Sequence, residues 1–450
     1  MKLTAIILAA GHGTRMRSKL PKVLHPLMGK PLLSYAIDAV TGLSDEKPVV
    51  VVGHEADVVK AVIGDDVTYA LQEAQLGTGH AVLSAKPYVN SETQLVLVSF
   101  GDMPLLTGET LRSLVELHQS NSSVLTMSSL VGEVPRGFGR IVRDGNGDVC
   151  AIVEEAVATP EQLAIREYNV SAYCFDARWL WQSLTKITPS PRGEYYLTDL
   201  VEIAVGQGHK IQSLILDDTD EGMGVNTRVH LAEASAALRR RINCDWMLAG
   251  VTIVDPATTY IEPQVRIGQD TVILPNTHLQ GNTLIGADCE IGPNTIIFDS
   301  TVGDQCRLFE STIESALLEN HVSMGPFCHL RKGAHLADGV HMGNFGEVKD
   351  SYLGQGVKMG HFSYIGNAKI DKNVNIGAGT ITCNYDGVNK NLTEIGENTF
   401  IGSDTMLVAP IRIGKNAKTG AGSVVTKDVE DNTVVVGVPA HVIKRTEKSD

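Results

Sequence analysis

The sequence L-I-G-A-D-C-E-I-G-P-N-T at residues 284–295 contains the dipeptide Ile-Gly twice, six residues apart. The same spacing separates further pairs that end in glycine: Met359-Gly360 and Ile365-Gly366, Ile395-Gly396 and Ile401-Gly402, and Ile413-Gly414 and Thr419-Gly420. Longer intervals also fit this period, since Gly268 and Gly286 are eighteen residues apart, as are Gly325 and Gly343. A short period sustained over residues 264–439 indicates a repetitive structure rather than chance pairs in an ordinary β domain.

The six-residue period predicts a parallel β-helix of hexapeptide repeats. Each unit supplies one short strand with an inward aliphatic side chain, and glycine or a small polar residue allows the turn at the corner. Three units make one eighteen-residue coil, so residues eighteen positions apart are expected to stack. A single coil buries little, whereas stacked coils share a continuous core. We assign residues 251–450 to this domain.

The bulk composition describes an acidic protein with several domains. Its 450 residues allow two or three domains that each bury a core. The chain is 43% hydrophobic and 20% charged, with a net charge of −14. This charge argues against nucleic acid or a membrane surface as a partner. An acidic protein that handles anionic substrates has to concentrate its cations locally, so local basic clusters are the segments of interest.

The seven cysteines form no C-x-x-C pair and are odd in number. This pattern favours reduced thiols over a disulfide framework. The apolar run Leu3–Ala10 is too short for a signal peptide and is followed by G-H-G-T-R rather than a cleavage site. No apolar run approaches the roughly 18 residues of a membrane span. We therefore expect a cytoplasmic protein without membrane insertion.

Apolar strands alternate with helices in residues 1–226, which predicts a doubly wound, Rossmann-like α/β domain. The expected strands are Leu3–Ala10, Val49–Val52 and Leu95–Val98, and the expected helices are Leu32–Val40, Glu55–Val62 and Gly79–Ser84. In such sheets ligands bind at the carboxyl ends of the strands. The loop that starts at Gly11 and the segment F-G-D at residues 100–102 each follow a strand, so they should meet at one site.

The loop after the first strand carries four cations within eight residues: Arg15, Arg17, Lys19 and Lys22. Glycines let backbone N–H groups approach phosphate, and cations neutralise it. The loop is therefore either a phosphate-binding loop or an exposed turn, and it matches neither G-x-G-x-x-G nor the P-loop motif. Asp102 is correspondingly either a magnesium ligand beside bound phosphates or an ordinary turn residue.

The motif L-A-A-G-x-G-T-R-M at residues 8–16, with Pro21-Lys22, resembles nucleotidyltransferases that join nucleoside triphosphates to sugar 1-phosphates. Further motifs of that family follow in order: Gln72, Gly77-Thr78, Gly137-Phe138-Gly139-Arg140, Glu154, Asn169 and Gly224-Val225-Asn226. Over nearly the whole chain the resemblance is closest to one bifunctional family. Its members combine N-acetylglucosamine-1-phosphate uridyltransferase with glucosamine-1-phosphate acetyltransferase, and so supply UDP-N-acetylglucosamine for peptidoglycan and lipopolysaccharide.

This resemblance implies a uridyltransferase site in residues 1–226. Arg15 and Lys22 would act on the triphosphate, and Asp102 and Asn226 would bind Mg²⁺. The residues implied in binding UTP or UDP-N-acetylglucosamine are Leu8, Ala9, Ala10, Gly11, Lys22, Gln72, Gly77, Thr78, Phe100, Gly101, Asp102, Gly139, Glu154, Asn169 and Asn226. Among them, Gly139, Glu154 and Asn169 would hold the sugar. A glutamine amide both donates and accepts hydrogen bonds, which suits the edge of uracil.

Residues 227–250 predict a helical linker, because they are rich in helix formers, lack proline and end at Ala249-Gly250. The run Arg239-Arg240-Arg241 points in three directions on a helix, so we interpret it as a solvated face rather than a nucleic-acid site. His329, His335 and His341 are six residues apart, which places them on three different faces of a coil. The grid therefore argues against a metal site within one chain.

The six-residue grid breaks at 381–394, and insertions in repeat proteins form loops on a face that often binds ligands. The string G-A-G-T-I-T-C-N-Y-D-G around this break resembles the acetyltransferase half of the same bifunctional family. The resemblance implies a left-handed coil and His361 as general base, and a histidine that titrates near neutrality can take the proton of a sugar amine. The implied glucosamine-phosphate residues are Arg331, Lys349, Tyr364 and Asn375, and the implied acetyl-CoA residues are Ala378, Asn384, Tyr385, Ser403 and Ala421.

Two positions depart from the family pattern. Phe100 stands where the family can have tyrosine, and Gly437 stands where an arginine can contact coenzyme phosphate. We expect a homotrimer that uses UTP, glucosamine 1-phosphate, N-acetylglucosamine 1-phosphate and acetyl-CoA, with Mg²⁺ as cofactor. The alternatives are a single-activity sugar-1-phosphate nucleotidyltransferase with a regulatory or oligomerising β-helix, and a non-catalytic scaffold.

Overall fold

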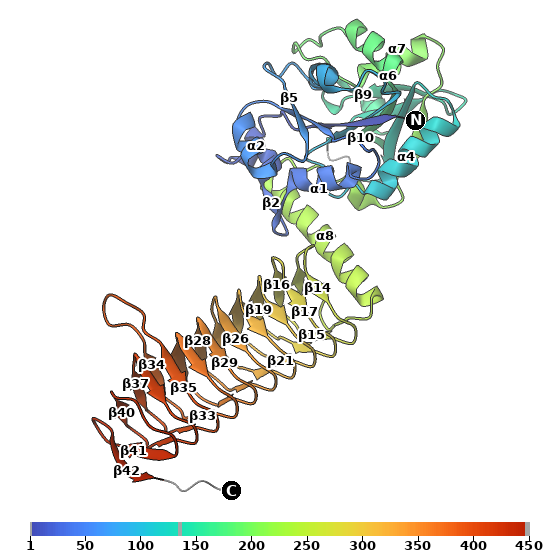
Figure 1. Cartoon of the computed structure of the whole chain (residues 1–450). Coiled ribbons are helices and arrows are strands. Elements are labelled where there is room, and N and C mark those ends of the chain that lie inside the picture. Colours follow the sequence, from blue (N-terminus) through green and yellow to red (C-terminus); the bar gives the residue numbers. More distant parts are fainter. Residues whose placement is uncertain (1, 134–136, 446–450) are drawn as a thin grey trace. The chain divides into compact units, whose positions relative to one another are not determined.

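The computed structural model describes residues 2–133 and 137–445 (Figure 1). The chain divides into two compact units, one ending at Leu238 and the other beginning at Arg239. The division falls within helix α8 (Arg228–Leu248), which is the helix expected at 227–250. Among the described residues, no helix has the length and apolarity that crossing a membrane requires.

The first unit is built on a mixed β-sheet with the strand order β11-β7-β10-β6-β1-β4-β5. Strands β4, β1 and β6 are parallel neighbours, and this part has the doubly wound arrangement that the sequence predicts. The strands of this unit are β1 (Leu3–Leu8), β2 (Pro26–Leu27), β3 (Lys30–Pro31), β4 (Val49–Val52), β5 (Thr68–Leu71), β6 (Leu95–Phe100), β7 (Leu125–Val131), β8 (Arg140–Arg143), β9 (Val149–Val153), β10 (Glu167–Asp176) and β11 (Gln212–Ile215).

Helices cover the sheet of the first unit, and two separate apolar clusters result. Alternate residues of β1 serve different clusters: Ile6 and Leu8 belong to one, and Ala5 and Ile7 to the other. Burial on both faces explains why the central strands are continuous apolar runs. The helices are α1 (Leu32–Val40), α2 (Ala56–Ile63), α3 (Thr78–Ala85), α4 (Gly108–Ser120), α5 (Pro160–Leu163), α6 (Ala177–Ser183) and α7 (Asp199–Gly206).

One strand of the first unit has a direction that the sequence does not reveal. Strand β10 lies between β6 and β7 and is antiparallel to both. It also pairs with the hairpin β8–β9, which extends the sheet beside the segment 137–139. Strand direction depends on how the chain returns to the sheet, and the apolar pattern of a buried strand is the same in either direction.

The second unit is a coil of parallel strands that forms three sheets (Figure 1). We call these sheets the first, second and third faces. The first face is β12 (Thr252–Ile253), β15 (Val272–Ile273), β18 (Glu290–Ile291), β21 (Arg307–Leu308), β24 (Ser323–Met324), β27 (His341–Met342), β30 (Lys358–Met359), β33 (Asn375–Ile376), β36 (Phe400–Ile401), β39 (Lys418–Thr419), β41 (Thr433–Val436) and the antiparallel β42 (His441–Arg445).

The second and third faces complete each coil. The second face is β13 (Tyr260–Ile261), β16 (His278–Gln280), β19 (Ile296–Phe298), β22 (Thr312–Glu314), β25 (His329–Leu330), β28 (Gly346–Lys349), β31 (Ser363–Gly366), β34 (Ile381–Cys383), β37 (Met406–Val408) and β40 (Val424–Val425). The third face is β14 (Arg266–Ile267), β17 (Leu284–Ile285), β20 (Thr301–Val302), β23 (Leu317–Leu318), β26 (Ala334–Leu336), β29 (Ser351–Leu353), β32 (Ala368–Ile370), β35 (Thr393–Ile395) and β38 (Ile411–Ile413).

The core of the second unit is the column of inward aliphatic side chains that the six-residue period predicts. Ile273, Ile291 and Leu308 stack on one another from neighbouring strands of the first face, and all three are fully buried. Burial of such a side chain contributes about 1.5–3 kcal/mol to stability. Because each coil repeats this contact on three faces, the stacked coils hold together without long helices.

The coil length is less regular than the sequence predicts. His278 stacks on Ile296 eighteen residues later, whereas Ile296 stacks on Thr312 only sixteen residues later. The expectation that residues eighteen apart always stack is therefore wrong. A corner can lose a residue without cost to the core, because only the inward position of each strand has to be kept.

The break in the grid is shorter than predicted. Residues 381–383 and 393–394 belong to strands β34 and β35, and the loop comprises residues 384–392. Asp386 stabilises this loop by accepting hydrogen bonds from the N–H groups of Val388 (2.8 Å) and Asn389 (2.7 Å). These contacts, that of Asn389 first, lower the pKa of the Asp386 carboxyl. The loop is thus an ordered turn of its own.

The three histidines spaced six residues apart do not form one cluster, and the arginine run of α8 makes one contact that was not predicted. His329, His335 and His341 belong to the second, third and first faces, as predicted, and each contacts a different partner: Glu314, Glu319 and Ser323. No group of three or more potential metal ligands occurs in the described part of the chain. Arg239 is not simply solvated, since its guanidinium lies 4.7 Å from the ring centre of Tyr260.

Candidate active sites

In the first unit, the loop after β1 and the segment after β6 meet at the carboxyl edge of the sheet. The N–H of Gly101 donates to the carbonyl of Leu8 at 3.0 Å, and the N–H of Ala9 donates to Val51 at 2.8 Å. The carboxyl ends of β1, β4 and β6 therefore lie next to one another. The loop at Gly11 and the F-G-D segment therefore lie next to each other, as expected.

A polar cluster occupies this edge. The ammonium Nζ of Lys22 lies 2.5 Å from Oδ2 of Asp102 and 3.0 Å from Oδ1 of Asn226. Arg15 donates from Nη2 to the same Oδ1 of Asn226 at 3.0 Å. The side chains of Lys22 and Asp102 are only 12% and 19% exposed. Two oxygens from segments distant in the sequence thus converge on one cation.

A cavity of about 470 Å³ opens beside this cluster. Its lining includes most of the predicted nucleotide residues: Leu8, Ala9, Ala10, Gly11, Arg15, Lys22, Gln72, Gly77, Thr78, Phe100 and Asp102. Gln72 is 3% exposed, and its Nε2 donates to the carbonyl of Gly77 at 3.1 Å. Its amide is therefore held in a fixed orientation. Gly77 has a φ of +102°, and a Cβ there would lie 2.5 Å from the carbonyl of Tyr195, so the turn requires glycine.

A second cavity of about 250 Å³ contains the predicted sugar residues Gly139, Glu154 and Asn169. It shares Thr78, Phe100 and Tyr196 with the first cavity, so the two are neighbours. Burial raises the pKa of Glu154, and a hydrogen bond from Thr198 at 3.3 Å partly opposes this shift. A carboxyl group in this setting accepts hydrogen bonds from a neutral hydroxylated ligand more readily than it tolerates a nearby anion.

Several residues that line these cavities were not among the predicted residues. They are His12, Gln75, Ser171, Glu194, Tyr196 and Thr198. The segment that carries Glu194 and Tyr196 precedes α7 and has no glycine-rich or basic pattern. The hydrogen bond from the N–H of Gly79 to the carbonyl of Tyr195 (2.8 Å) holds it against α3. No local signal marks such a contact.

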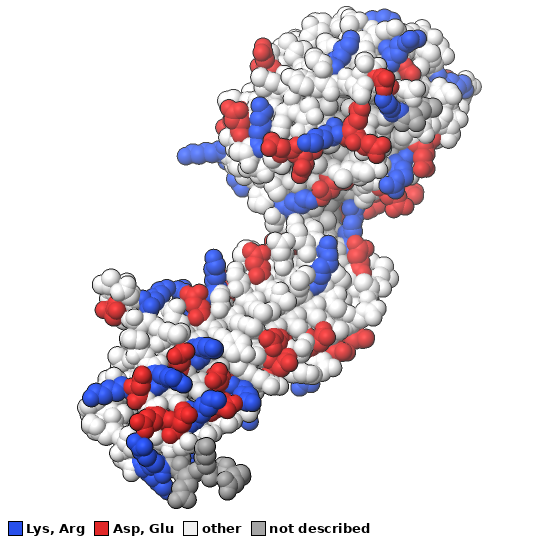
Figure 2. Space-filling model, viewed as in Figure 1, with Lys and Arg blue, Asp and Glu red and all other residues white. Residues whose placement is uncertain are grey.

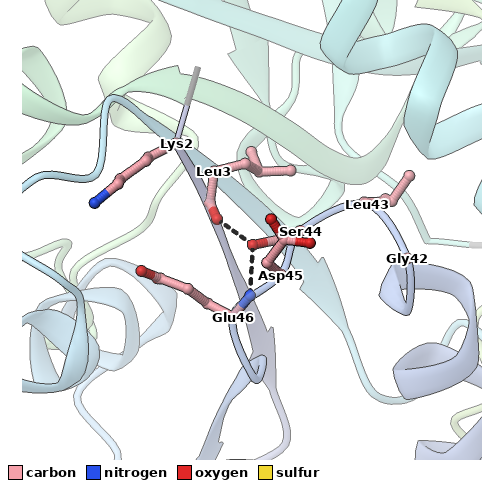
Figure 3. Close-up of a pocket in the computed structure, with 7 residues that line it drawn as sticks. All are labelled: Lys2, Leu3, Gly42, Leu43, Ser44, Asp45 and Glu46. Carbon is pink, nitrogen blue, oxygen red and sulfur yellow. Dashed lines mark hydrogen bonds between the residues drawn. The ribbon is translucent and has the colours of Figure 1, made fainter.

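A different hollow of about 270 Å³ lies at the opposite edge of the sheet, near the start of β1 (Figure 3). It is lined by Lys2, Leu3, Gly42, Leu43, Ser44, Asp45 and Glu46. Ser44 is already engaged there, since its hydroxyl donates to the carbonyl of Leu3 at 2.6 Å and accepts from the N–H of Glu46 at 3.1 Å. None of the predicted site residues lies in this hollow.

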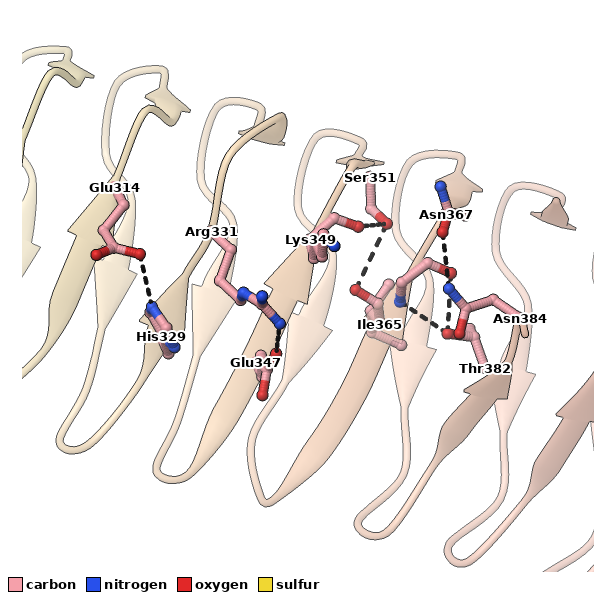
Figure 4. A network of polar contacts seen from close by, with 11 residues as sticks. Glu314, His329, Arg331, Glu347, Lys349, Ser351, Ile365, Asn367, Thr382 and Asn384 are labelled. Carbon is pink, nitrogen blue, oxygen red and sulfur yellow. Dashed lines mark hydrogen bonds and ion pairs between the residues drawn. The ribbon is translucent and has the colours of Figure 1, made fainter. Parts of the chain in front are cut away.

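In the second unit, cations gather on neighbouring coils of the second face (Figure 4). Arg331 follows β25 and pairs with Glu347 at 3.0 Å, and Lys349 ends the next strand, β28. The nearby ammonium of Lys390 lowers the pKa of Lys349, and Arg331 adds to the effect. Lys390, the only lysine in the loop 384–392, was not among the predicted residues. A cluster of Arg331, Lys349 and Lys390 can bind an anion.

Four other predicted residues share one corner, between the first and second faces. His361, Ala378, Ser403 and Ala421 each follow a glycine at this corner in successive coils. The carbonyl of Ala378 accepts from the N–H of Asp404 at 2.6 Å, and that of Ser403 accepts from Gly422 at 2.8 Å. The four residues therefore form a row along the coil, with His361 at one end and exposed.

The remaining predicted residues lie on either side of this row. Tyr364 belongs to β31 on the second face, in the same coil as His361, whereas Asn375 belongs to β33 on the first face. Asn384 is 7% exposed and donates from Nδ2 to Asn367 at 2.7 Å, and Tyr385 on the loop is 63% exposed. The structure thus brings Arg331, Lys349 and Tyr364 together on one face, with Asn375 across the corner.

On the C-terminal coils, acidic and basic side chains lie close to one another and form ion pairs. Figure 2 shows acidic and basic side chains interspersed over the C-terminal coils. Glu397, for example, lies 3.4 Å from Lys372 and 3.3 Å from Lys415. Paired charges of this kind differ from the cluster around Lys349, in which cations face one another.

Two protein families match this sequence. The MobA-like NTP transferase domain matches residues 5–162, and the bacterial transferase hexapeptide (six repeats) matches residues 264–299 and 392–427. These matches agree with the predicted fold class, a nucleotidyltransferase domain followed by a left-handed β-helix of hexapeptide repeats.

Curated relatives match over nearly their full length. The bifunctional protein GlmU of Heliobacterium modesticaldum is 46% identical over 436 residues, which are 97% of this chain and 95% of its own. That of Geobacillus sp. (strain WCH70) is 46% identical over 445 residues, covering 99% and 97%. That of Exiguobacterium sibiricum is 47% identical over 433 residues, covering 96% of each.

Proposed function

This chain belongs to the family of bifunctional GlmU proteins, and from that premise we propose how its two units divide two transfer reactions. It is an enzyme of UDP-N-acetylglucosamine synthesis, both an acetyltransferase and a uridyltransferase. The observation that supports the division is that each unit gathers its own cations beside its own polar groups, Arg15 and Lys22 in the first and Arg331 and Lys349 in the second.

In the first unit, UTP would occupy the cavity of about 470 Å³, with its triphosphate on Arg15 and Lys22 and its base near Gln72. N-acetylglucosamine 1-phosphate would occupy the neighbouring cavity, with its hydroxyl groups near Glu154 and Asn169. Its phosphate oxygen attacks the α-phosphorus of UTP, a new P–O bond forms, and pyrophosphate leaves with the electrons of the broken P–O bond. Holding both anions beside two cations lowers their repulsion and aligns them.

The residues around Lys22 suit a divalent cation. Oδ2 of Asp102 and Oδ1 of Asn226 already converge on one positive charge, the ammonium of Lys22. Carboxylate and amide oxygens are hard donors of the kind Mg²⁺ prefers, together with substrate phosphates. Bound Mg²⁺ would neutralise charge on the triphosphate as pyrophosphate departs. Lys22 would then turn from Asp102 and Asn226 toward the phosphates.

In the second unit, Arg331 and Lys349 would bind the phosphate of glucosamine 1-phosphate, and Lys390 adds a third cation. Tyr364 and Asn375 would contact the sugar. Acetyl-CoA would run along the corner row formed by Ala378, Ser403 and Ala421, with Asn384 and Tyr385 beside it. The sugar amine attacks the thioester carbonyl, His361 takes its proton, and the coenzyme thiolate leaves and is protonated.

An omission experiment tests this assignment. The protein is incubated with glucosamine 1-phosphate, acetyl-CoA, UTP and Mg²⁺, and each is left out in turn. Free thiol should appear without UTP, whereas pyrophosphate should require all four components. Pyrophosphate release without any thiol release would instead favour a single-activity nucleotidyltransferase with a non-catalytic coil.

We further propose that the coil assembles three copies of the chain. Phe327, Phe345 and Phe362 form an exposed ridge along the corner that also carries His361, and they are 56%, 57% and 56% exposed. The rings of Phe327 and Phe345 stack with centroids 5.2 Å apart. A continuous apolar ridge of this kind marks a surface that another chain covers. A homotrimer would also bring residues of a second copy toward the exposed His361.

Replacing Phe345 with aspartate should break this assembly, because a charge cannot be buried unpaired at an apolar contact. We expect light scattering to report three times the 48.3 kDa chain mass for the wild type and a single chain mass for Phe345→Asp. Val62→Asp is the control. Val62 is 53% exposed on α2 of the first unit, and its replacement should leave the mass unchanged. An unchanged mass for Phe345→Asp would refute the ridge as the contact.

We also propose a cytoplasmic location. All seven cysteines are present as free thiols, including the exposed Cys244. Thiols persist in a reducing compartment, and the substrates named above are intracellular metabolites.

A further inference from the structure

Glu221 is a buried carboxylate that lines neither cavity of the first unit. It is 8% exposed and lies on the short 3-10 helix η6 (Thr219–Gly222). Its Oε2 accepts from the N–H of Thr107 at 3.0 Å, and its Oε1 accepts from the hydroxyl of Thr110 at 3.0 Å. The hydroxyl of Thr107 lies 3.2 Å from Oε2 as well. A buried charge with this many donors is fixed in position.

The partners of Glu221 begin helix α4, and that helix has a cap without it. Thr107 is the N-cap residue, and its Oγ1 accepts from the N–H of Thr110 at 3.2 Å. A carboxylate is favourable at a helix N-terminus because it meets unpaired N–H groups and the positive end of the helix dipole. The additional contact therefore does more than cap α4. It ties η6 to the segment that connects β6 to α4.

That segment, residues 101–107, contains Asp102, and the chain after η6 contains Asn226. Hydrogen bonds join the segment 101–107 to the segment 221–226 at both ends. Glu221 holds Thr107 at one end, and at the other the N–H of Val225 donates to the carbonyl of Asp102 at 2.8 Å. Asn226 follows Val225 directly, and its Oδ1 lies 3.0 Å from the Lys22 ammonium that also contacts Asp102.

Close packing between the two fastening points leaves little freedom. A Cβ on Gly224 would lie 3.3 Å from Sδ of Met103, and a Cβ on Gly222 would lie 3.0 Å from Leu130. The segment 221–226 therefore packs against Met103 of the β6–α4 connection and against Leu130 of β7. Movement at Glu221 would be transmitted to Asn226 because little space exists in which to absorb it.

We propose that Glu221 is a positioning residue for uridyl transfer, which sets the distance between the side-chain oxygens of Asp102 and Asn226. The proposal rests on the proposed function of these two oxygens as cation ligands. A cation site requires each donor atom to lie within a few tenths of an ångström of its ideal position. Substituting a residue that holds the ligands in place therefore weakens cation affinity by about 10–100-fold.

Glu221→Gln tests this role, because glutamine keeps the volume but loses one of the two acceptor oxygens and the charge. With UTP bound, we expect the dissociation constant for Mn²⁺, measured by electron paramagnetic resonance, to rise about 10-fold or more. The Mg²⁺ concentration for half-maximal uridyl transfer should rise in parallel. Acetyl transfer, which uses the other unit, should not change.

Asp176→Asn is the matched control. Asp176 caps helix α6 in the same unit by accepting from the N–H of Trp179 at 2.7 Å, and it lines neither cavity. This variant should leave Mn²⁺ affinity unchanged, because asparagine caps a helix about as well as aspartate and the nucleotide site is not touched. Thr110→Val provides a milder second test. It removes the 3.0 Å hydrogen bond to Oε1 and the 3.1 Å hydrogen bond that the Thr110 hydroxyl accepts from Thr107, and it should shift Mn²⁺ affinity in the same direction by less.

The proposal is overturned if Glu221→Gln shifts Mn²⁺ affinity no more than Asp176→Asn does. If Glu221→Gln does not fold, an unshifted affinity in Thr110→Val overturns it equally. If Asp102 and Asn226 are not cation ligands at all, the measurements differ in another way. Asp102→Ala would then leave Mn²⁺ affinity in the presence of UTP unchanged, whatever Glu221→Gln does.

Discussion

Replacement of His361 by alanine should lower acetyl transfer by about 10²–10⁴-fold, the contribution of a general base, and leave uridyl transfer intact. The amine of glucosamine 1-phosphate has to lose a proton as it attacks the thioester, and alanine cannot accept one. His361 begins the corner row that also contains Ala378 and Ser403, and its side chain is exposed, so its loss should not destabilise the coil. Thiol release from acetyl-CoA measures the first activity, and pyrophosphate release with added N-acetylglucosamine 1-phosphate measures the second.

His335→Ala is the control for this prediction. His335 lies on the third face, where its Nε2 is 2.7 Å from Oε1 of Glu319. We expect it to leave both activities unchanged. If folded His361→Ala retained acetyl transfer, or if it lost both activities, the role assigned to His361 would be wrong.

Asp102→Ala should have the opposite effect, lowering uridyl transfer by about 10²–10³-fold while acetyl transfer persists. Two contributions are lost together. Asp102 supplies one of the two oxygens that converge on a cation, and it also orients Lys22, whose Nζ lies 2.5 Å away. Pyrophosphate release at saturating UTP and Mg²⁺ measures the loss.

Asp45→Ala is the control for Asp102→Ala. Asp45 lies in the hollow at the opposite edge of the same sheet, so its removal takes a carboxylate from the unit without touching the site. It should leave pyrophosphate release at the wild-type rate. Equal losses in the two variants would mean that Asp102 acts through the stability of the unit rather than through the site.

The coil was the most predictable part of this protein. A six-residue period has a direct physical cause, since every strand needs one inward aliphatic and every corner needs a residue that can turn, so Ile285 and Ile291 reveal the fold locally. The stacking register was less predictable. Corners tolerate the loss of a residue, and the coil from Ile296 to Thr312 has lost two, so this step is sixteen residues rather than eighteen.

The nucleotide site was predictable only in part. The cations of the loop after β1 are visible in the sequence because they cluster within one segment. Asn226 is not, because its contact with Arg15 spans 211 residues and depends on how β10 and the following helices return to the sheet. Glu194 and Tyr196 were missed for the same reason. The case of Lys390 is different. The sequence predicts the loop that carries it, but nothing in the sequence indicates that this lysine lies near Lys349.

The most direct test of two separate sites is to mix His361→Ala with Asp102→Ala. Each variant alone is given glucosamine 1-phosphate, acetyl-CoA, UTP and Mg²⁺, and UDP-N-acetylglucosamine is measured by chromatography. Neither should form product above the residual rate, whereas the mixture should, because Asp102→Ala releases N-acetylglucosamine 1-phosphate that His361→Ala can use. A mixture of the two folded variants that forms no more product than either alone would contradict the division of the two reactions between two independent sites.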